Sequence, residues 1–470
     1  MLDFLNQFKK KPNGMSRDKI AELLKISPEA FAAFEKEYSA TVLNQVSDDF
    51  FHINAKQAAS EKEGILCDEQ YKIGDIKQRI VDELLSEAEV SSYGNDGTCI
   101  HSRSVSGKPT NTVTPEEILS LPEDLRPQFT GSMMLTSGMN FSSGETAAFV
   151  YSKYLQEKNQ QKKQFLYHLF RQGLDILDYD WLLYQMIGTN PNSIGYWFPV
   201  LAKAVKLQDF FKIPATTIMK VPMPVLQMTR VGYDALTRTT LDIVDDFCFQ
   251  AFGLSEDRDY FIKTGTYSSK FDFRNAHVHG ENEVRQLGEY LLFIHYQANM
   301  MADPLSNPCI YGVSTTNEWA VREFISDHEN NPCIYKGLPL HTEYRVFVDF
   351  DTKEILGMAP YWDPDVMKKH FSRNNDSDNI HDYAVYKSHE DVLMKRYHKN
   401  KDIVALHVQQ LVQDMNFHGQ WSVDIMQDGN DFWIIDMALA KNSALSSCVP
   451  DGKLNSVPEN WIPELSEDVL

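Results

Sequence analysis

The sequence predicts an α+β protein with a mainly helical N-terminal region and a C-terminal half that mixes strands with helices. Two observations carry this prediction. Residues 15–46 and 75–90 show the apolar spacing that is typical of helices. After about residue 207, short β-branched segments alternate with amphipathic helical segments. The chain has 470 residues, more than one ordinary domain, so we expect two or three folding units.

The expected division of the chain follows its local composition. Residues 1–131 form a mainly helical N-terminal region, with a long loop near 91–131 that is rich in Ser, Gly, Thr and Pro. Residues 132–206 form a helical segment that packs on the next domain or links to it. Residues 207–470 form the strand-rich domain, in which residues 363–399 are polar and charged and are expected to be an exposed excursion.

The overall composition excludes several classes of protein. A formal charge of −21, from 45 basic and 66 acidic residues, argues against a nucleic-acid footprint over the whole surface. None of the six Cys residues forms a CxxC pair, which excludes zinc-ribbon and thioredoxin-like sites and fits a reducing compartment. The sequence shows no signal peptide and no apolar run long enough to span a membrane. We therefore expect a cytoplasmic protein without a nucleic-acid or membrane partner.

A predicted β-hairpin near the C-terminus carries the first candidate site. Residues 421–436 are expected to form two strands joined by a tight turn at 427–430, where Gly and Asn tolerate positive φ. Asp424 and Asp436 are expected near the far ends of these strands, where two carboxylates could converge. Paired carboxylates repel each other unless a cation or a proton lies between them, and Mg²⁺ prefers such oxygen ligands. The alternative is that both are exposed acids that only flank a turn.

Two further segments carry candidate binding residues. A strand ends at Lys263 and is followed by a small polar loop, residues 264–270. A Lys at a strand end, with loop amides beside it, is a common way to bind phosphate, although such a Lys can also extend along the surface to water. The strand at 319–325 ends in Glu323, Phe324 and Ile325.

A third strand, residues 342–350, places Glu343, Arg345 and Phe347 on one face because side chains alternate along a strand. An Arg in the middle of a sheet is costly unless it meets an anion. That anion could be a bound phosphate, or it could be Glu343 or another acid of the protein.

The order of these segments resembles the ATP-grasp superfamily, over roughly residues 207–448. In that fold two α+β subdomains close on ATP. The resemblance implies that ATP and Mg²⁺ are cofactors, with Lys263 and Arg345 in catalytic roles. It implies phosphate contacts from Lys220, Lys263, Gly265, Thr266, Ser268, Ser269, Lys270 and Arg345, with Lys212 the alternative to Lys220. It implies an adenine hinge at Glu323, Phe324 and Ile325, a ribose partner at Glu329, and metal ligands at Asp424, Asp436 and Asn442.

The sequence departs from the pattern of this superfamily at two points. The metal motif usually continues as acid-x-Asn, whereas here Asp436 is followed two residues later by Ala438. Asn442 is the expected substitute for the missing ligand. The phosphate loop also has a single Gly, Gly265, and is poorer in Gly than typical members.

The resemblance implies a Mg²⁺- and ATP-dependent ligase that activates a carboxylate as an acyl phosphate for attack by an amine, with a peptide or protein among the candidate substrates. Two alternatives stay open. The chain could be a non-ligating, ATP-binding assembly factor or chaperone, or it could use the same site as a kinase does. The resemblance is closer to the divergent members, which include an assembly chaperone of a translation initiation factor, than to the biotin carboxylase type.

Overall fold

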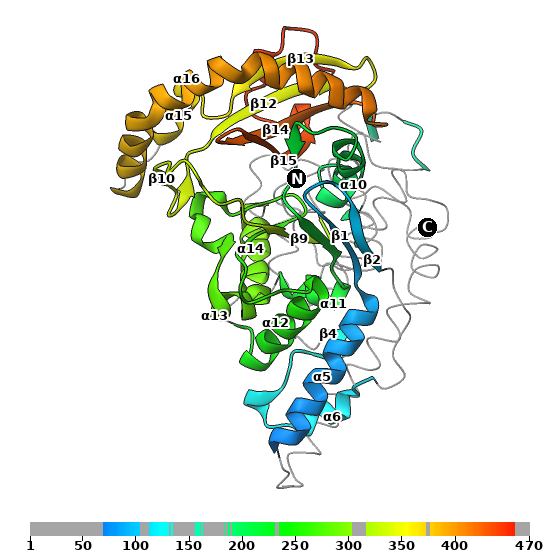
Figure 1. Ribbon diagram of the computed structural model, residues 1–470. Helices are drawn as coiled ribbons and strands as arrows, with labels where there is room; N and C mark the ends of the chain where they lie inside the picture. Colours follow the sequence, from blue (N-terminus) through cyan, green and yellow to red (C-terminus); the bar gives the residue numbers. More distant parts are fainter. Residues whose placement is uncertain are drawn as a thin grey trace.

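The computed structural model describes residues 69–103, 112–130, 133–134, 156–159, 161–162, 184, 187–188, 190–230, 235–302, 316–372 and 377–455. Helices and sheets are both present in these ranges, which confirms the predicted α+β class. The helix expected at 15–46 and most of the helical segment expected at 132–206 lie outside the described residues. Two large sheets, each covered by helices, make up the body of the molecule (Figure 1).

The first sheet has six strands in the order β2-β1-β6-β9-β7-β8. The strand bounds are β1 Glu89–Tyr93, β2 Cys99–Arg103, β6 Thr216–Lys220, β7 Tyr260–Thr264, β8 His277–Val278 and β9 Glu318–Glu323. Neighbouring strands are antiparallel, with Lys263 opposite Ala320 and Phe261 opposite Arg322. Alternation therefore sends Phe261, Lys263 and Arg322 to one face of this sheet.

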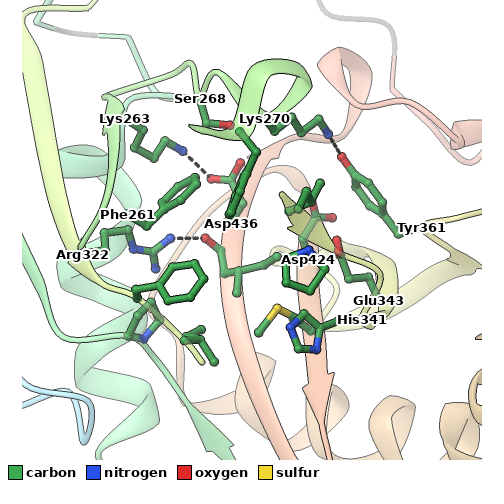
Figure 2. Close-up of a pocket in the computed structure, with 18 of the residues that line it drawn as sticks. Phe261, Lys263, Ser268, Lys270, Arg322, His341, Glu343, Tyr361, Asp424 and Asp436 are labelled. Carbon is green, nitrogen blue, oxygen red and sulfur yellow. Dashed lines mark hydrogen bonds and ion pairs between the residues drawn. The ribbon is translucent and has the colours of Figure 1, made fainter. Parts of the chain in front are cut away.

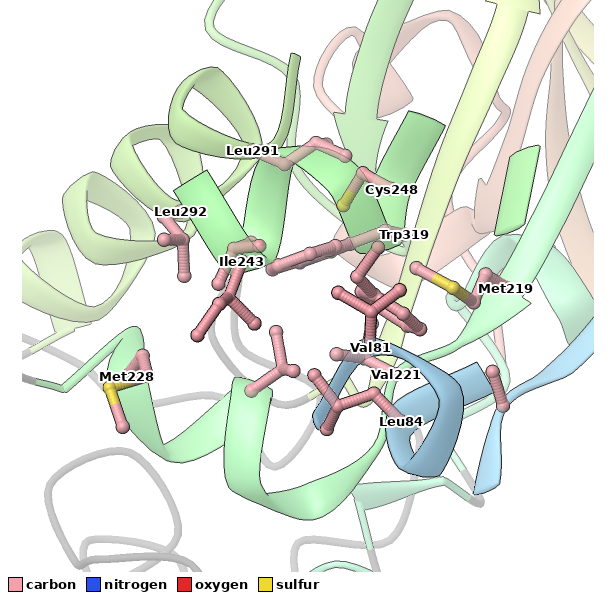
Figure 3. Packing of buried hydrophobic residues seen from close by; sticks show 14 of the residues in the cluster. Val81, Leu84, Met219, Val221, Met228, Ile243, Cys248, Leu291, Leu292 and Trp319 are labelled. Atoms are coloured by element: carbon pink, nitrogen blue, oxygen red, sulfur yellow. The ribbon is translucent and has the colours of Figure 1, made fainter. Parts of the chain in front are cut away.

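The opposite face of the first sheet is covered by three helices: α5 Glu69–Glu87, α12 Arg238–Phe252 and α14 Leu287–Ala302. Trp319 of β9 is fully buried among residues of these helices, which include Val81, Ile243 and Leu291 (Figure 3). Helix α12 begins where the Thr237 side chain accepts a hydrogen bond from the Thr240 amide.

The second sheet has five strands in the order β13-β12-β14-β15-β5. Their bounds are β5 Phe211–Lys212, β12 Thr342–Asp349, β13 Glu354–Pro360, β14 Gln420–Asp428 and β15 Asp431–Leu439. Helix α16 (Ser377–Asp414) lies across one face of this sheet (Figure 1). Val404, Val408 and Leu411 of α16 share a core cluster with Val346 and Val423 of the sheet. Because of alternation, the other face of this sheet carries Glu343, Arg345, Phe347 and Asp424.

Shorter elements connect and flank the two sheets. They are α6 Pro115–Leu119, η1 Glu123–Leu125, β3 Phe129–Thr130, β4 Met133–Met134, α10 Ile194–Val205, α11 Met223–Met228, η3 Lys270–Asn275, α13 Gly280–Arg285, β10 Cys333–Ile334, β11 Leu338–Pro339, α15 Pro364–Phe371, η4 Ala440–Asn442 and η5 Ser446–Cys448. Helix α10 joins the second core cluster through Trp197 and Phe198, both fully buried. The described part of the chain contains no helix that is long and apolar enough to cross a membrane.

Two local predictions are wrong. The excursion expected at 363–399 is helical, because α15 is capped by Asp363 and the long helix α16 begins at Ser377 and buries Tyr386, Leu393 and Tyr397 within this stretch. The loop expected near 91–131 contains most of the hairpin β1–β2, which adds two strands to the first sheet through β6. That sheet therefore uses residues on both sides of the boundary expected at 206, although the division into domains stays a prediction.

A glycine fixes the β1–β2 hairpin against α10. Gly97 has φ +78°, and a Cβ placed there would lie 2.0 Å from the carbonyl oxygen of Ala202. We expect Gly97→Ala to lower the free energy of unfolding by at least about 2 kcal/mol, measured by urea denaturation. The cost combines the backbone strain of an alanine at positive φ with the clash of its Cβ against the Ala202 carbonyl. Gly452→Ala is the matched control, because Gly452 has φ +79° but open space around its Cα. Equal losses in the two variants would contradict the proposed contact.

Candidate functional site

A pocket lies between the two sheets, at the faces that the covering helices leave open (Figure 2). Its wall includes both charged and apolar side chains, and both sheets contribute to it. The residues that line it are Pro214, Phe261, Lys263, Ser268, Lys270, Phe273, Arg322, Glu323, Phe324, Ile325, Leu338, Pro339, His341, Glu343, Tyr361, Trp362, Asp424, Met426, Ile435 and Asp436.

Two acidic residues and one arginine form a row across the second sheet. Asp424 pairs directly with Asp436 on one neighbouring strand and with Arg345 on the other. Both acids lie within their strands and not near the far ends, where they were expected. The strands are longer than expected, from 420 to 428 and from 431 to 439, because only Gly429 and Asn430 form the turn between them. The two carboxylates nevertheless come together on the pocket face, as the hairpin prediction required.

Arg345 is bound by an acid of the protein itself. Its Nε donates to Asp424 Oδ1 at 2.7 Å and its Nη2 donates to Oδ2 at 2.6 Å. Burial lowers the pKa of Arg345, but the Asp424 carboxylate outweighs burial and raises it above the usual value. The sequence left either a bound phosphate or an acid of the protein, such as Glu343, as the partner of this arginine. In the structure the partner is a protein acid, and it is Asp424. The arginine itself is not part of the pocket lining.

One ion pair joins the two sheets across the pocket. Lys263 Nζ of β7 lies 3.1 Å from Asp436 Oδ1 of β15 (Figure 2). The Lys263 side chain is only 5% exposed, whereas Asp436 is 43% exposed. The ammonium is thus held inside the pocket, and the carboxylate keeps a side open to solvent or to a ligand.

A second cationic group comes from the loop after β7. Lys270 donates a hydrogen bond to the Tyr361 hydroxyl, and its Nζ lies 4.6 Å from the centre of that ring. Glu343 is buried nearby; burial raises its pKa to about 8, although Lys270 and Arg345 act in the opposite direction. Ser268 also lines the pocket from this loop.

Arg322 is a pocket residue that the sequence analysis did not select. It is 3% exposed, its Nε donates to Thr216 Oγ1 at 3.2 Å, and its Nη1 donates to the Ile435 carbonyl. Its Nη2 is buried and has no hydrogen-bond partner among the described residues. Burial lowers its pKa to about 10. The sequence signal that could have found Arg322 is the alternation of side chains along a strand. When β9 pairs with β7, alternation puts Arg322 on the same face of the sheet as Lys263.

The expected adenine hinge also lines the pocket. Glu323, Phe324 and Ile325 follow one another at the end of β9. The Glu323 amide donates to the Ala215 carbonyl at 2.8 Å, and the Phe324 ring stacks on His277 at 3.8 Å between centroids. Apolar side chains also line the pocket, including Phe261, Leu338, Met426 and Ile435.

Several predicted phosphate contacts lie outside the pocket lining. Lys220 lies at the far end of β6, where its Nζ is 3.7 Å from Glu89. Gly265 is packed against Ser193 and Thr316, and its amide donates to the Glu318 carbonyl.

The remaining phosphate-loop residues have local partners. The Thr266 amide donates to Thr264 Oγ1, and Ser269 Oγ donates to Gln297. Lys212, the alternative to Lys220, forms an exposed ion pair with Asp431.

The predicted ribose partner and the third metal ligand also lie outside this lining. Glu329 forms an ion pair with Arg396 at 3.0 Å. The Asn442 side-chain oxygen accepts a hydrogen bond from Asn192 at 3.4 Å, in the short helix η4 that follows β15. The structure therefore brings together Lys263, Ser268, Lys270, the hinge and the two Asp residues, and leaves the other predicted contacts outside the pocket.

A second group of potential cation ligands lies beside the pocket. Ligand atoms of Asp327, His341 and Asp428 lie within 4.8 Å of one another. Asp327 already accepts backbone hydrogen bonds from Glu329 and Asn331. Asp428 accepts from the backbone amide of His328. These contacts hold the segment after β9 against the end of β14.

Comparisons with known proteins identify no family for the chain. No protein-family model matches it, and no curated protein matches it. Among solved structures, Cdc123 from Schizosaccharomyces pombe is similar, with 12% identity, a TM-score of 0.32, and coverage of 60% of this chain and 96% of that one. A C-terminally truncated Cdc123 from the same organism gives 13% identity, a TM-score of 0.31, and coverage of 57% and 90%. At TM-scores this low the likeness carries nothing about function.

Proposed function

We propose that the pocket between the two sheets binds ATP together with Mg²⁺. The observation that carries this proposal is the meeting of opposite charges in one pocket. Lys263, Lys270 and Arg322 come from the first sheet and its loop, and Asp424 and Asp436 come from the second sheet. Cations buried in a low-dielectric pocket attract a polyanion strongly, and the phosphates of ATP would replace Asp436 as the partner of Lys263.

The donor set fits Mg²⁺. Asp424 and Asp436 lie directly opposite each other on adjacent strands, and both face the pocket. Carboxylate oxygens from one or two residues, together with substrate phosphates, are the usual ligands of this ion. When bound, Mg²⁺ would neutralise charge on the phosphates. The Lys263 ammonium would orient them from the opposite wall.

Apolar side chains of the pocket fit the base. Phe261, Leu338, Met426 and Ile435 offer the flat, apolar contacts that an adenine ring needs. The hinge at Glu323 to Ile325 would supply backbone groups at the edge of the ring. The charged and apolar side chains of the lining together match an amphiphilic ligand of the nucleotide class.

Within this class, we favour an ATP-binding assembly factor over a ligase. Transfer of the terminal phosphoryl group to a carboxylate needs cations that are free to meet the charge that develops. Arg345, the residue expected in that role, is held in a bidentate pair by Asp424. Ala438 also stands where the superfamily has a ligating Asn. Both features weaken the case for ligation.

The test is calorimetric titration of the full chain with ATP in the presence and absence of Mg²⁺. We expect Asp436→Asn to weaken Mg·ATP binding roughly tenfold, about 1.4 kcal/mol, because a neutral amide replaces a charged metal ligand. Asp431→Asn is the matched control, since Asp431 begins the same strand but forms an exposed pair with Lys212. Identical Mg·ATP affinities in the parent and in Asp436→Asn would reject the metal assignment.

The products then separate the candidate functions. Bound ATP that stays intact across a panel of carboxylates, amines and peptides supports the assembly factor. Release of ADP and phosphate with formation of an amide would overturn that choice in favour of a ligase. ADP together with a phosphorylated product would indicate a kinase.

A further inference from the structure

Three side chains from separate segments of the chain meet beside the pocket. Asp327 follows β9, His341 lies between β11 and β12, and Asp428 ends β14. His341 Nδ1 is 3.8 Å from Asp327 Oδ1 and 4.0 Å from Asp428 Oδ1, and one ligand atom of each residue lies within 4.8 Å of the others. The side chains of His341, Asp428 and Asp327 are 4%, 5% and 14% exposed. Two carboxylates and an imidazole nitrogen therefore share a small volume with little access to water.

The imidazole of His341 presents a lone pair to the two acids. Burial lowers the pKa of His341 and outweighs Asp327 and Asp428, which act in the opposite direction, so the ring is neutral. The Asn331 side-chain amide, 3.4 Å from Nδ1, can only donate to this nitrogen. The proton of the ring is therefore on the other nitrogen, and the Gln427 backbone accepts it in a hydrogen bond.

This arrangement gathers electron-rich atoms without a buried cation to balance them. Carboxylates that lie close together repel each other unless a cation or a proton lies between them. Among the described residues, no Lys or Arg forms an ion pair with Asp327 or Asp428, and Asp428 pairs with the exposed ring of His328. A neutral imidazole whose second nitrogen is held by a backbone carbonyl is the form in which His ligates metals.

The hydrogen bonds of the two acids leave lone pairs for a further ligand. Asp428 accepts from the His328 amide at one oxygen and contacts the His328 ring at the other. Asp327 accepts from the Glu329 amide and from the backbone and side-chain amides of Asn331. A carboxylate has about four lone-pair sites, so these contacts fill neither acid. Such N–H donors orient the carboxylates in the way that the outer partners of metal ligands do.

We propose that Asp327, His341 and Asp428 form a binding site for Zn²⁺. An imidazole nitrogen beside two carboxylates suits Zn²⁺ better than Mg²⁺ or Ca²⁺, which prefer oxygen ligands alone. Ligands about 2.0–2.2 Å from one zinc ion are about 3.3–3.6 Å apart in a tetrahedron. The separations of 3.8 and 4.0 Å thus need only a small inward movement. Water would complete the tetrahedron, as is usual for three protein ligands.

The ion would fasten the two sheets to each other at the edge of the pocket. Asp327 belongs to the segment that leaves β9 of the first sheet, whereas Asp428 ends β14 of the second. His341 also lines the pocket. The site is separate from the Asp424 and Asp436 pair, since four residues of β14 span about 13 Å. The proposal therefore goes beyond the proposed function and does not depend on it.

The experiment titrates Zn²⁺ into the reduced, chelator-treated full chain without nucleotide, followed by calorimetry. We expect one tightly bound ion per chain and a higher Tm when Zn²⁺ is present. His341→Gln, which can still donate to the Gln427 backbone, should weaken Zn²⁺ binding at least about tenfold. His418→Gln is the matched control, because His418 pairs with Asp351 at 2.9 Å in an exposed position. Its Zn²⁺ affinity should equal that of the parent.

Asp327→Asn provides a second measurement, because Asn keeps an oxygen for the backbone amides of its turn and loses the charge. Zn²⁺ binding should again weaken at least about tenfold, and circular dichroism checks that both variants are folded. The proposal is overturned if the parent binds no Zn²⁺, or if a folded His341→Gln or Asp327→Asn binds it as the parent does. An equal loss in His418→Gln would also overturn it, because the ion would then bind to surface histidines. ATP is absent throughout, so failure of the proposed function would be a different result.

Discussion

Lys263→Met should weaken Mg·ATP binding about a hundredfold, a loss of ~2.7 kcal/mol, as measured by calorimetry. Lys263 is almost fully buried in the pocket and would give the phosphates a desolvated charge-assisted contact. Methionine keeps the aliphatic stem and removes only the charge. The free energy of unfolding should change little, because Asp436, the present partner of Lys263, is partly open to solvent and can be hydrated.

Lys212→Met is the matched control for this variant. Lys212 is also at the end of a strand and paired with an Asp, but its ion pair with Asp431 is exposed on both sides. ATP affinity should therefore match that of the parent. Parental affinity in Lys263→Met, with Mg²⁺ present, would show that the phosphates bind elsewhere.

Arg345→Met should lower the free energy of unfolding by about 3–5 kcal/mol in a guanidinium titration. The variant leaves the Asp424 carboxylate, 8% exposed, without the guanidinium that holds both of its oxygens. A buried charge that loses its partner costs far more than the pair contributes as a whole. The arginine is therefore expected to act on stability first, whatever its part in ligand binding.

A double-mutant cycle separates this pair effect from general damage to the sheet. In Arg345→Met combined with Asp424→Asn, both charges are gone, so the loss should be clearly smaller than the sum of the two single losses. Additive losses would mean that the two side chains contribute independently, and the assignment of Arg345 to a structural pair would be wrong.

Much of the pocket could be predicted, because the sequence shows which side chains of a strand alternate onto the same face. The apolar pattern already indicates the strands at or near which Lys263, Glu323 and Asp436 lie. The strands that carry them were recognised from the sequence, and their ends lie within three residues of the expected bounds. The order of such strands, together with short turns, is enough to place a few side chains at one sheet edge.

The failures have a different origin, because they depend on pairing between distant segments. The partner of Arg345 is Asp424, and nothing local in the sequence shows that β12 lies beside β14. The same reason hides Arg322, which enters the pocket only when β9 lies between β6 and β7. Residues 377–399, the first part of helix α16, were missed for another reason: their exposed face is so polar that this part resembles a loop, and only the side chains that it buries reveal the helix.

The position of β5 has a mechanical consequence. Strand β5 belongs to the second sheet and β6 to the first, and only Ile213, Pro214 and Ala215 separate them. Three residues span at most about 10 Å when fully extended. Pro214 itself lines the pocket. The two sheets are therefore held close together where this crossing lines the pocket, so any motion of one sheet relative to the other would be a rotation about the crossing and not a separation.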